Sequence, residues 1–479
     1  EDTALLSSRR RSRGPTGPAA AFVEGSDARA AGARSVPDDG VVCRGGRPPH
    51  WPAVDVTITQ ERADTVDATA LIVALTDDLS PAIYSINRLR PDSLCFVLPE
   101  SAKPLVETEA QPKISQMPRR WDWVLLPDIG HFPSCYQAMA RSLPAMLRNW
   151  GIELGSLVVD TTGATAAMAS ALALVTLPFT SRIVSLVASG EGREGDVVAL
   201  ENGERLWVTV NPWDEAAEVA RRDGCDLFNR GAYVAAGSVF RQIEARVSGG
   251  QKPLYRAFAD LADGYDHWER FHYRQAWEKL KTSVKAMEMA TLFGGPPGLK
   301  AALPSIKTNA GFLEKLVLDP ADVKEFLAFD LLAHASRRLR VGNDAEAAMQ
   351  SLVRALEAFA QRQLFKQYRI KSWDVQPEQL PQALQDICRT CYLEDIDGKY
   401  KLPLQAQFRV LAGLGDPMGQ TFLHEWPGLK PLLDAANHAV LGHGFDTVKS
   451  ERVQQLYDVV VKLTGAQDGS LPKFPVLSL

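Results

Sequence analysis

Five short runs of apolar, β-branched residues occur in the first half of the chain, and helical stretches lie between several of them. This alternation constrains the fold more than any other feature. Strands that alternate with helices form a parallel sheet with helices on both faces. The runs are ALIVALT (70–76), SLCFVLPE (93–100), WDWVLLPD (121–128), SLVVDTT (156–162) and RIVSLVAS (182–189).

The strand pattern ends after a predicted hairpin. In DVVALENGERLWVTV, the pair Asn202 and Gly203 favours a type I′ turn. Residues 214–465 then carry apolar residues at helical spacing almost throughout, as paired helices without a fixed repeat. GNDAEAAMQSLVRALEAFAQRQLFKQY predicts a long helix capped by Asn343 or Asp344. We therefore expect an α/β domain followed by an all-α C-terminal region.

Composition divides the chain into four regions. Residues 1–52 are rich in Arg, Gly, Ala and Pro and contain no lysine, which is typical of a disordered tail or of a segment that is not native. We expect the α/β domain over 53–213 and a helical linker region over 214–300. The helix-breaking stretch LFGGPPGLKAALPS precedes a last helical domain, expected over 301–479.

Bulk properties exclude several classes of protein. The net charge of -5 gives no broad attraction to nucleic acid, so an RNA substrate requires a local basic cleft. No apolar run reaches bilayer length and the N-terminus lacks an apolar signal region, so we expect a cytoplasmic protein without a membrane partner. Six scattered cysteines suit reduced thiols. We expect Cys388 and Cys391 to be buried thiols one helical turn apart, and no metal site.

A ligand site is predicted where the fourth strand meets its helix. In SLVVDTTGATAAMASALAL the strand ends at Asp160, and a loop of small residues opens into an apolar helix. Free N–H groups at the helix start, the bare backbone of Gly163 and the hydroxyls of Thr162 and Thr165 suit a phosphate. A tight turn with a threonine cap explains the same pattern without a ligand.

A second polar loop strengthens the prediction of a ligand cleft. ALTDDLSPAIYSI leaves the first strand through Thr76, Asp77, Asp78 and Ser80, and Pro81 suits the first turn of the next helix. Two polar loops at one edge of a parallel sheet favour a cleft more than either loop alone.

VVDTTGATAAMASAL resembles the D-x-T-G-G-T-K-x-M loop of CARF domains, the Rossmann-like domains associated with CRISPR systems. Ala164 replaces the second glycine, and Ala166 replaces the lysine, which removes a point charge for phosphate or ribose. The resemblance covers about residues 60–212 and implies a dimer that binds cyclic oligoadenylate across its dimer face. The matching residues are Asp160, Thr162, Gly163, Thr165 and Met168.

A second site is predicted in LDAANHAVLGHGF, residues 433–445. A histidine such as His443 can accept and donate a proton near neutral pH, and Asn437 can donate and accept hydrogen bonds. Helical spacing places Ala436 and His443 along one side of a helix, with His443 at its end beside Gly444. The local pattern alone is also typical of ordinary helix capping.

ANHAVLGHGF resembles the R-N-x5-H-G signature of HEPN ribonucleases, with Ala436 where the arginine stands. Glu357, Gln361 and Arg362 resemble the E-x3-K/Q-R element on the partner helix of the same domain. This resemblance spans about residues 320–465. A CARF-like half followed by a HEPN-like half is the architecture of the ancillary ribonucleases of type III CRISPR antiviral defence in prokaryotes.

The resemblance implies a homodimer that cleaves single-stranded RNA without metal or cofactor, with cyclic oligoadenylate as allosteric activator. The 2′-hydroxyl attacks the adjacent phosphate, which leaves a 2′,3′-cyclic phosphate and a 5′-hydroxyl. His443 would transfer protons and Asn437 would position groups, with Glu357 and Arg362 in the catalytic set. Loss of the arginine at Ala436 weakens the site, on the order of 100- to 1000-fold for one such donor. Arg362 is a candidate to replace it.

Two alternatives remain open. The helical half could be inactive, which leaves a sensor of cyclic oligoadenylate, or the protein could be a ring nuclease that degrades the messenger near Thr76, Asp77 and Ser80. A nucleotide-binding oxidoreductase is disfavoured because TTGAT lacks the G-x-G-x-x-G spacing. The run SRRLR at 336–340 predicts a solvated basic helical face, and in an RNA-binding dimer it could line the cleft.

Overall fold

The computed structural model describes residues 69–479 apart from 154, 189–194, 201–202 and 321. The predicted tail, residues 1–52, lies outside the described residues. Within the described chain seven strands form one sheet in the order β3-β2-β1-β4-β5-β7-β6. The strands are β1 (Ala70–Ala74), β2 (Ser93–Pro99), β3 (Arg120–Leu126), β4 (Leu157–Asp160), β5 (Thr180–Ala188), β6 (Asp196–Leu200) and β7 (Gly203–Val210).

The strand order places a ligand crevice between β1 and β4. Strands β1 to β5 pair in parallel, and the chain moves outward from β1 to β2 and β3 before it returns to β4 on the other side of β1. The winding direction therefore reverses between β1 and β4, where open parallel sheets bind ligands. The hairpin prediction is confirmed by the antiparallel pairing of Leu200 with Gly203, although Asn202 lies outside the described residues.

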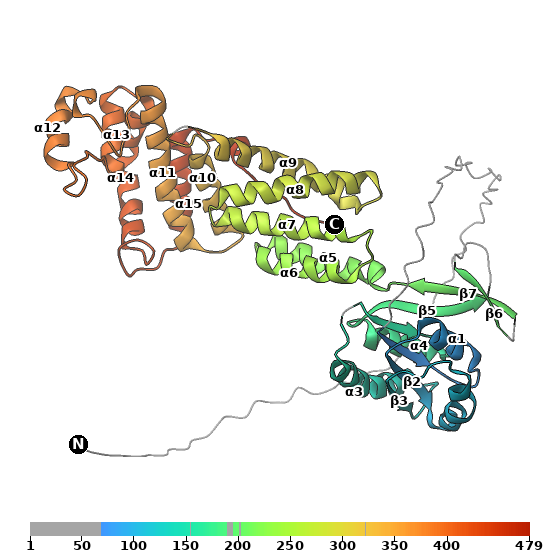
Figure 1. Ribbon diagram of the computed structural model, residues 1–479. Helices are drawn as coiled ribbons and strands as arrows, with labels where there is room; N and C mark the ends of the chain where they lie inside the picture. Colours follow the sequence, from blue (N-terminus) through green and yellow to red (C-terminus); the bar gives the residue numbers. More distant parts are fainter. Residues whose placement is uncertain (1–68, 154, 189–194, 201–202, 321) are drawn as a thin grey trace, which may run out of the picture. The chain divides into compact units, whose positions relative to one another are not determined.

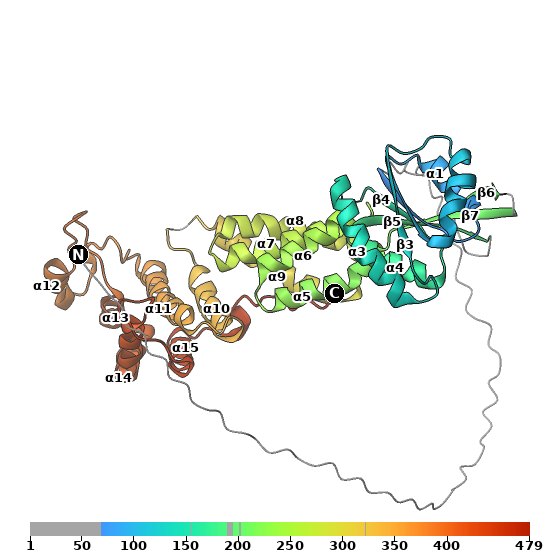
Figure 2. The same ribbon diagram turned by 90° about the horizontal axis from the view of Figure 1, so that it is seen from below.

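Helices cover both faces of the sheet (Figure 2). Leu71 and Val73 face α1, whereas Ile72 and Ala74 face α3 and α4, because successive strand residues point to opposite faces. All four side chains are buried, which confirms the predicted parallel sheet covered on both sides. The covering helices are α1 (Ser80–Leu89), α2 (Lys103–Leu105), α3 (Phe132–Trp150) and α4 (Ala166–Thr176).

After the sheet, five helices pack in sequence, each against the next (Figure 1). Their shared core includes the fully buried rings of Tyr265 and Trp268. The C-terminal segment returns to this core, where the ring centroid of Phe474 lies 4.6 Å from that of Tyr265. The Asn229 side-chain amide also donates to the Leu477 carbonyl at 2.8 Å. The helices are α5 (Trp213–Asn229), α6 (Tyr233–Arg246), α7 (Lys252–Glu269), α8 (Tyr273–Leu292) and α9 (Pro297–Leu318).

Helix α9 begins at the sequence break near residue 300. Its buried residues Leu299, Ile306 and Leu313 lie in the same cluster as those of α5 to α8. By packing, α9 therefore groups with the preceding helices.

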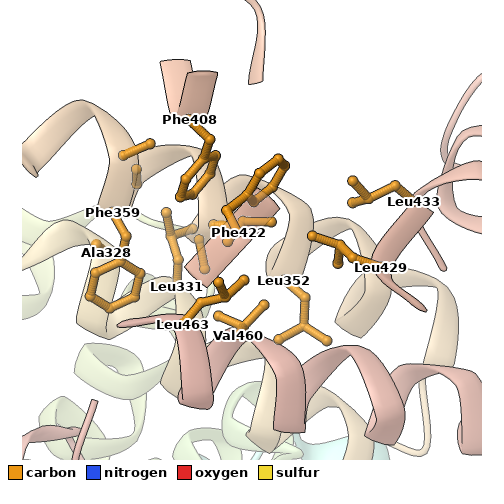
Figure 3. Packing of buried hydrophobic residues seen from close by; sticks show 14 of the residues in the cluster. Ala328, Leu331, Leu352, Phe359, Phe408, Phe422, Leu429, Leu433, Val460 and Leu463 are labelled. Carbon is orange, nitrogen blue, oxygen red and sulfur yellow. The ribbon is translucent and has the colours of Figure 1, made fainter. Parts of the chain in front are cut away.

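The last helices surround α11, which packs against α10, α13, α14 and α15. The rings of Phe408 and Phe422 stack in this core with centroids 4.0 Å apart, and Leu352 and Val460 belong to the same cluster (Figure 3). Asp344 caps α11 by accepting from the Ala347 N–H at 3.0 Å, so of the two predicted caps, Asn343 and Asp344, the structure uses Asp344. The helices are α10 (Leu327–Arg340), α11 (Ala345–Tyr368), α12 (Gln382–Cys391), α13 (Leu404–Gly413), α14 (Pro417–His438) and α15 (Ser450–Thr464).

A buried polar cluster joins α7 to α10 and α11. His334 Nδ1 lies 2.9 Å from the Ser351 hydroxyl oxygen, and Arg338 Nε donates to His334 Nε2 at 3.2 Å, which fits a neutral ring protonated on Nδ1. Burial, together with the nearby guanidinium groups of Arg337 and Arg338, lowers the pKa of His334 to about 4. The carboxylate of Glu269, 3.4 Å from Nε2, opposes this shift.

Two sequence predictions about exposure are wrong. Cys388 is buried but Cys391 is exposed, because it ends α12. Arg337 does not lie on a solvated face: it donates to Glu269 at 2.6 Å, and its guanidinium lies 3.9 Å from the ring centroid of Phe474. None of the described helices is both long and apolar enough to cross a membrane.

Candidate functional site

The loops that follow β1 and β4 meet at the C-terminal edge of the sheet. The Thr76 hydroxyl donates to the Gly163 carbonyl at 3.1 Å. A Cβ on Gly163 would lie 2.7 Å from the Ala74 carbonyl oxygen, so a side chain does not fit there. Gly163 is thus required by close backbone approach. The structure brings together the two loops that the sequence predicted to form a cleft.

Asp160 organises the second loop from inside. Its side chain is buried, and Oδ1 accepts from the Thr162 N–H at 2.8 Å and from the Thr162 hydroxyl at 2.6 Å. The Ser85 hydroxyl donates to Oδ2, and burial raises the pKa of the carboxyl group. The Thr162 hydroxyl in turn accepts from the Leu186 N–H at 2.9 Å. These two side chains therefore shape the loop and have few polar atoms left for a ligand.

Thr165 and Met168 start helix α4. The Thr165 hydroxyl accepts from the Met168 N–H at 3.2 Å and donates to the Ile129 carbonyl. The Met168 side chain is fully buried between α4 and the sheet, so it anchors the helix and does not face the cleft. Thr165 also ties a third loop, residues 127–131 after β3, to the same edge.

Sequence reasoning missed this third loop. It carries the exposed residues Asp128 and His131, and the signal was available because WDWVLLPD was itself predicted as a neighbouring strand. Asp77 is exposed at the rim, and the Ser80 N–H donates to the Asp78 carboxylate at 3.0 Å. Ala166 is exposed in the first turn of α4, so positive potential at this point comes from the helix N-terminus.

At the far end of the chain, α14 ends at His438, and residues 440–443 form a turn. The predicted placement of Ala436 and His443 on one side of a helix is therefore wrong. Two glycines allow the chain to fold back over the helix end. A Cβ on Gly442 would lie 2.2 Å from the Ala436 carbonyl oxygen, and one on Gly444 would lie 2.2 Å from the His438 carbonyl oxygen.

The turn nevertheless brings His443 next to Asn437. The His443 N–H donates to the Asn437 carbonyl at 2.7 Å, and both side chains are exposed. Val440, Leu441 and Phe445 flank this pair and are also exposed, Phe445 by 97%. Clustered exposed apolar side chains of this kind mark a contact surface.

Ala436 itself is buried, with 1% of its surface exposed. Its carbonyl accepts from the Gln350 side-chain amide of α11 at 2.8 Å. An arginine at this position would begin inside the packing of α11 on α14, and its guanidinium would have to extend along the helices to the surface.

Glu357 and Arg362 do not join His443 within one subunit. Gln350 marks the part of α11 that touches the end of α14, and at about 1.5 Å per residue Glu357 lies about 10 Å and Arg362 about 18 Å farther along the axis. Arg362 donates to Glu325 at 3.1 Å. Glu357 accepts from Arg354 at 3.3 Å and from the Gln407 amide at 3.4 Å.

Three residues of α11 near the turn were missed by sequence reasoning. Gln350 holds the Ala436 carbonyl, and Glu346 accepts from the Val448 N–H at 2.9 Å, so the turn is fixed on both sides. Arg354 lies one helical turn beyond Gln350, about 6 Å along the axis, and its side chain is 42% exposed. The sequence signal that could have identified them is their spacing: Glu346, Gln350 and Arg354 are four residues apart and therefore share one face of the helix.

The comparisons with known proteins agree with this architecture. A Csm6 6H domain model matches residues 216–313 and a Csm6 HEPN domain model matches residues 321–467, together just over half of the chain. Csm6 of Enterococcus italicus, bound to cyclic hexa-2′-fluoro-hexa-dAMP, has a similar fold: the TM-score is 0.53 at 10% identity, over 84% of this chain and 95% of that one.

Other comparisons add little. Can2 of Sulfobacillus thermosulfidooxidans, in complex with cyclic tetra-adenylate, matches with a TM-score of 0.22 at 12% identity, over 64% of this chain and 71% of that one, which is too low to support an argument. No curated protein matches the chain.

A Rossmann-like sheet followed by helices that end in a HEPN domain defines the class of CARF–HEPN ancillary nucleases of type III CRISPR systems. Within that class, the two matched domains are those of Csm6, and the chain belongs to the Csm6 family. The predicted fold class is thereby confirmed.

Proposed function

We propose that this protein is a ribonuclease activated by cyclic oligoadenylate, and that it acts in the cytoplasm of a prokaryote during antiviral defence. The observation that carries the proposal is the turn in which His443 and Asn437, both exposed, are held together by a main-chain hydrogen bond of 2.7 Å inside the HEPN match. The E. italicus relative, which shares the fold, is bound to a cyclic hexanucleotide.

The crevice between β1 and β4 is the proposed binding site for the activator. The N-terminus of α4 attracts a ring phosphate, and Gly163 lets the loop before α4 pack directly against the end of β1. The bond between Thr76 and Gly163 links the two loops, so a ligand that moves one loop moves the other. Ligand binding shifts the protein only if the ligand has different affinities for two arrangements.

A homodimer is proposed because the apolar side chains beside His443 need a cover. Val440, Leu441 and Phe445 are exposed in the described chain, and full burial stabilises each such side chain by roughly 1.5–3 kcal/mol. A second copy of the same turn supplies an apolar cover and brings a second imidazole to the site.

The proposed chemistry uses these two imidazoles. One takes the proton of an RNA 2′-hydroxyl, whose oxygen then attacks the adjacent phosphorus. The bond from phosphorus to the 5′ oxygen breaks, and the second imidazole protonates that oxygen. The products are a 2′,3′-cyclic phosphate and a 5′-hydroxyl. Asn437 positions the phosphate by hydrogen bonding, and the proton transfers need no metal.

The absence of an arginine at position 436 supports a second candidate, a sensor without nuclease activity. Burial of Ala436 and the pairing of Arg362 with Glu325 leave the phosphate without the expected cation. Arg354, closer to the turn along α11, is the better candidate to replace it. For the ring-nuclease alternative, the Thr76 hydroxyl already donates to Gly163, which leaves Asp77 as the exposed acid at the crevice.

Three variants test the proposal by cleavage of a labelled single-stranded RNA, with and without cyclic tetra- and hexa-adenylate. His443→Ala removes cleavage, Ala436→Arg raises it on the order of 100- to 1000-fold, and EDTA has no effect. Arg354→Gln abolishes the residual activity of the parent if Arg354 serves as the cation. Equal rates for the parent and Ala436→Arg contradict the claim that the site is weakened. No cleavage by any variant, with activator bound, favours the sensor. Loss of the cyclic messenger without RNA cleavage favours the ring nuclease.

A further inference from the structure

A cleft of about 590 Å³ opens where the α5–α6 turn, the α10–α11 turn and the C-terminal segment come together. Its volume lies in the range of about 300–1,000 Å³ that is usual for ligand sites. It contains neither the crevice of the sheet nor the pair Asn437 and His443. The cationic side chains that line it are Arg230, Arg270, Arg337, Arg338, Arg340 and Lys473.

Acidic residues of the cleft neutralise only part of this charge. Arg337 and Arg338 share the carboxylate of Glu269, at 2.6 Å and 3.3 Å. Arg270 pairs with Asp266 at 3.0 Å, and Lys473 pairs with Asp468. The pairs with Glu269 join α7 to α10, and two arginines of the cleft remain outside these pairs.

Arg230 and Arg340 are the arginines in excess. Both are exposed, and across the described residues neither has a carboxylate within ion-pair distance. The two arginines lie on neighbouring turns. A Cβ on Gly231, next to Arg230, would lie 3.5 Å from Cγ1 of Val341, next to Arg340, so the two turns are in contact. Two free guanidinium groups on touching turns suit phosphate oxygens, which the planar group binds in a bidentate way.

The cleft lies close to the proposed nuclease turn along the chain. Gly342 lines the cleft, and Glu346, four residues later, holds the Val448 N–H of the loop that follows His443. Four residues span at most about 14 Å. The five residues from Val448 back to His443 add at most about 18 Å, so a single strand of roughly ten nucleotides, at about 3.4 Å each, reaches from the cleft to His443.

We propose that this arginine cleft binds the phosphodiester backbone of the single-stranded RNA to one side of the cleaved linkage. The inference rests on the proposed function, and it names a substrate contact outside the HEPN turn. The net charge of -5 makes such a local cation cluster necessary for a polyanionic substrate. In this proposal Arg340, the exposed last residue of the basic run at 336–340, contacts RNA.

Fluorescence anisotropy with a 2′-O-methylated single-stranded RNA tests the inference, since that RNA binds but lacks the attacking hydroxyl. Arg230→Gln with Arg340→Gln removes two phosphate contacts. At a slope of about 0.7 per contact, the salt dependence falls by about 1.4, and affinity at 0.1 M salt falls roughly 25-fold. Replacement of both arginines by lysine keeps the charge and restores most of the affinity.

The matched control is Arg222→Gln with Arg256→Gln. These side chains are 68% and 71% exposed and lie outside the cleft, so the same loss of charge is expected to change affinity less than twofold. The thermal unfolding midpoints of both double variants stay near that of the parent, because all four side chains are exposed.

The outcomes distinguish failure of the cleft proposal alone from failure of the proposed function. If the parent binds RNA and the two glutamine pairs have equal effects, the cleft is not an RNA site, while the ribonuclease proposal stands. If the parent binds no RNA at all, both proposals fail. If unlabelled cyclic tetra-adenylate or inorganic phosphate displaces the RNA as well as unlabelled RNA does, and only when Arg230 and Arg340 are present, the cleft is a general anion site and the inference is overturned.

Discussion

Substitution of Gly163 by alanine tests whether the β1 and β4 loops act as one unit. A Cβ there would lie 2.7 Å from the Ala74 carbonyl oxygen, and an ordinary contact needs 3.4 Å or more, so the loop must move by about 0.7 Å. The same movement lengthens the 3.1 Å bond from Thr76 to the Gly163 carbonyl beyond hydrogen-bond range. One methyl group thereby separates the two sides of the crevice.

The expected cost follows from these two effects. Overpacking costs roughly 1–3 kcal/mol, and loss of the hydrogen bond costs about 1 kcal/mol. The sum, about 2–4 kcal/mol, lowers the unfolding midpoint of the α/β domain by roughly 5–15 °C. Thr76→Val removes only the hydrogen bond and costs about 1 kcal/mol. Gly130→Ala is the matched control, because its Cβ meets only the Asp128 carboxylate, at 3.4 Å.

Differential scanning calorimetry and titration with cyclic tetra- and hexa-adenylate measure both consequences. We expect Gly163→Ala to unfold earlier than the parent and to bind the activator at least tenfold more weakly, with Thr76→Val between the two and Gly130→Ala like the parent. An unchanged midpoint and unchanged affinity for Gly163→Ala would show that the two loops do not act as one unit. Lower stability with unchanged affinity would place the ligand elsewhere.

Three further predictions concern the helical region. Because burial lowers the pKa of His334 to about 4, whereas an unfolded histidine titrates near pH 6.5, the unfolded state binds the proton first as the pH falls. Stability therefore drops between pH 6.5 and 4, by up to about 3 kcal/mol, and urea unfolding of His334→Gln shows a flatter profile over that window. Phe474→Ala removes the ring that packs against the α5–α9 core, and we expect it to lower the free energy of unfolding in urea by roughly 3–5 kcal/mol. A loss below about 1 kcal/mol would mean that the C-terminal segment does not dock on this core. Glu346→Ala releases the Val448 N–H, so hydrogen exchange in residues 439–448 speeds up several-fold while exchange in α15 stays unchanged.

The sequence predicted the sheet well because its signals are local. The buried strands β1 and β4 are short apolar runs, and the polar loops after them begin where the strands end. It predicted that Gly163 lets a ligand approach the backbone, whereas the group that approaches Gly163 closely is the Ala74 carbonyl of β1. The sequence could not predict which side chains of the loop are buried. Asp160 and Met168 match the family loop, yet both are buried.

The helical half shows the limits of periodicity. The pattern continued the helix past His438, because the reversal depends on Gly442 and Gly444 packing against carbonyl groups of the same helix end. Burial of Arg337 depends on Phe474, which arrives from far along the chain. Such contacts leave no trace in a local window, since neither partner is unusual by itself.

The most direct measurement of the central claim is the rate of RNA cleavage by Ala436→Arg, with and without cyclic oligoadenylate, beside Ala436→Arg combined with His443→Ala. We expect activator to raise the rate of the first protein and 2′,3′-cyclic phosphate ends to appear. We expect the second protein to be inactive although it binds the activator equally well. Cleavage that persists without His443, or that ignores the activator, would contradict that claim.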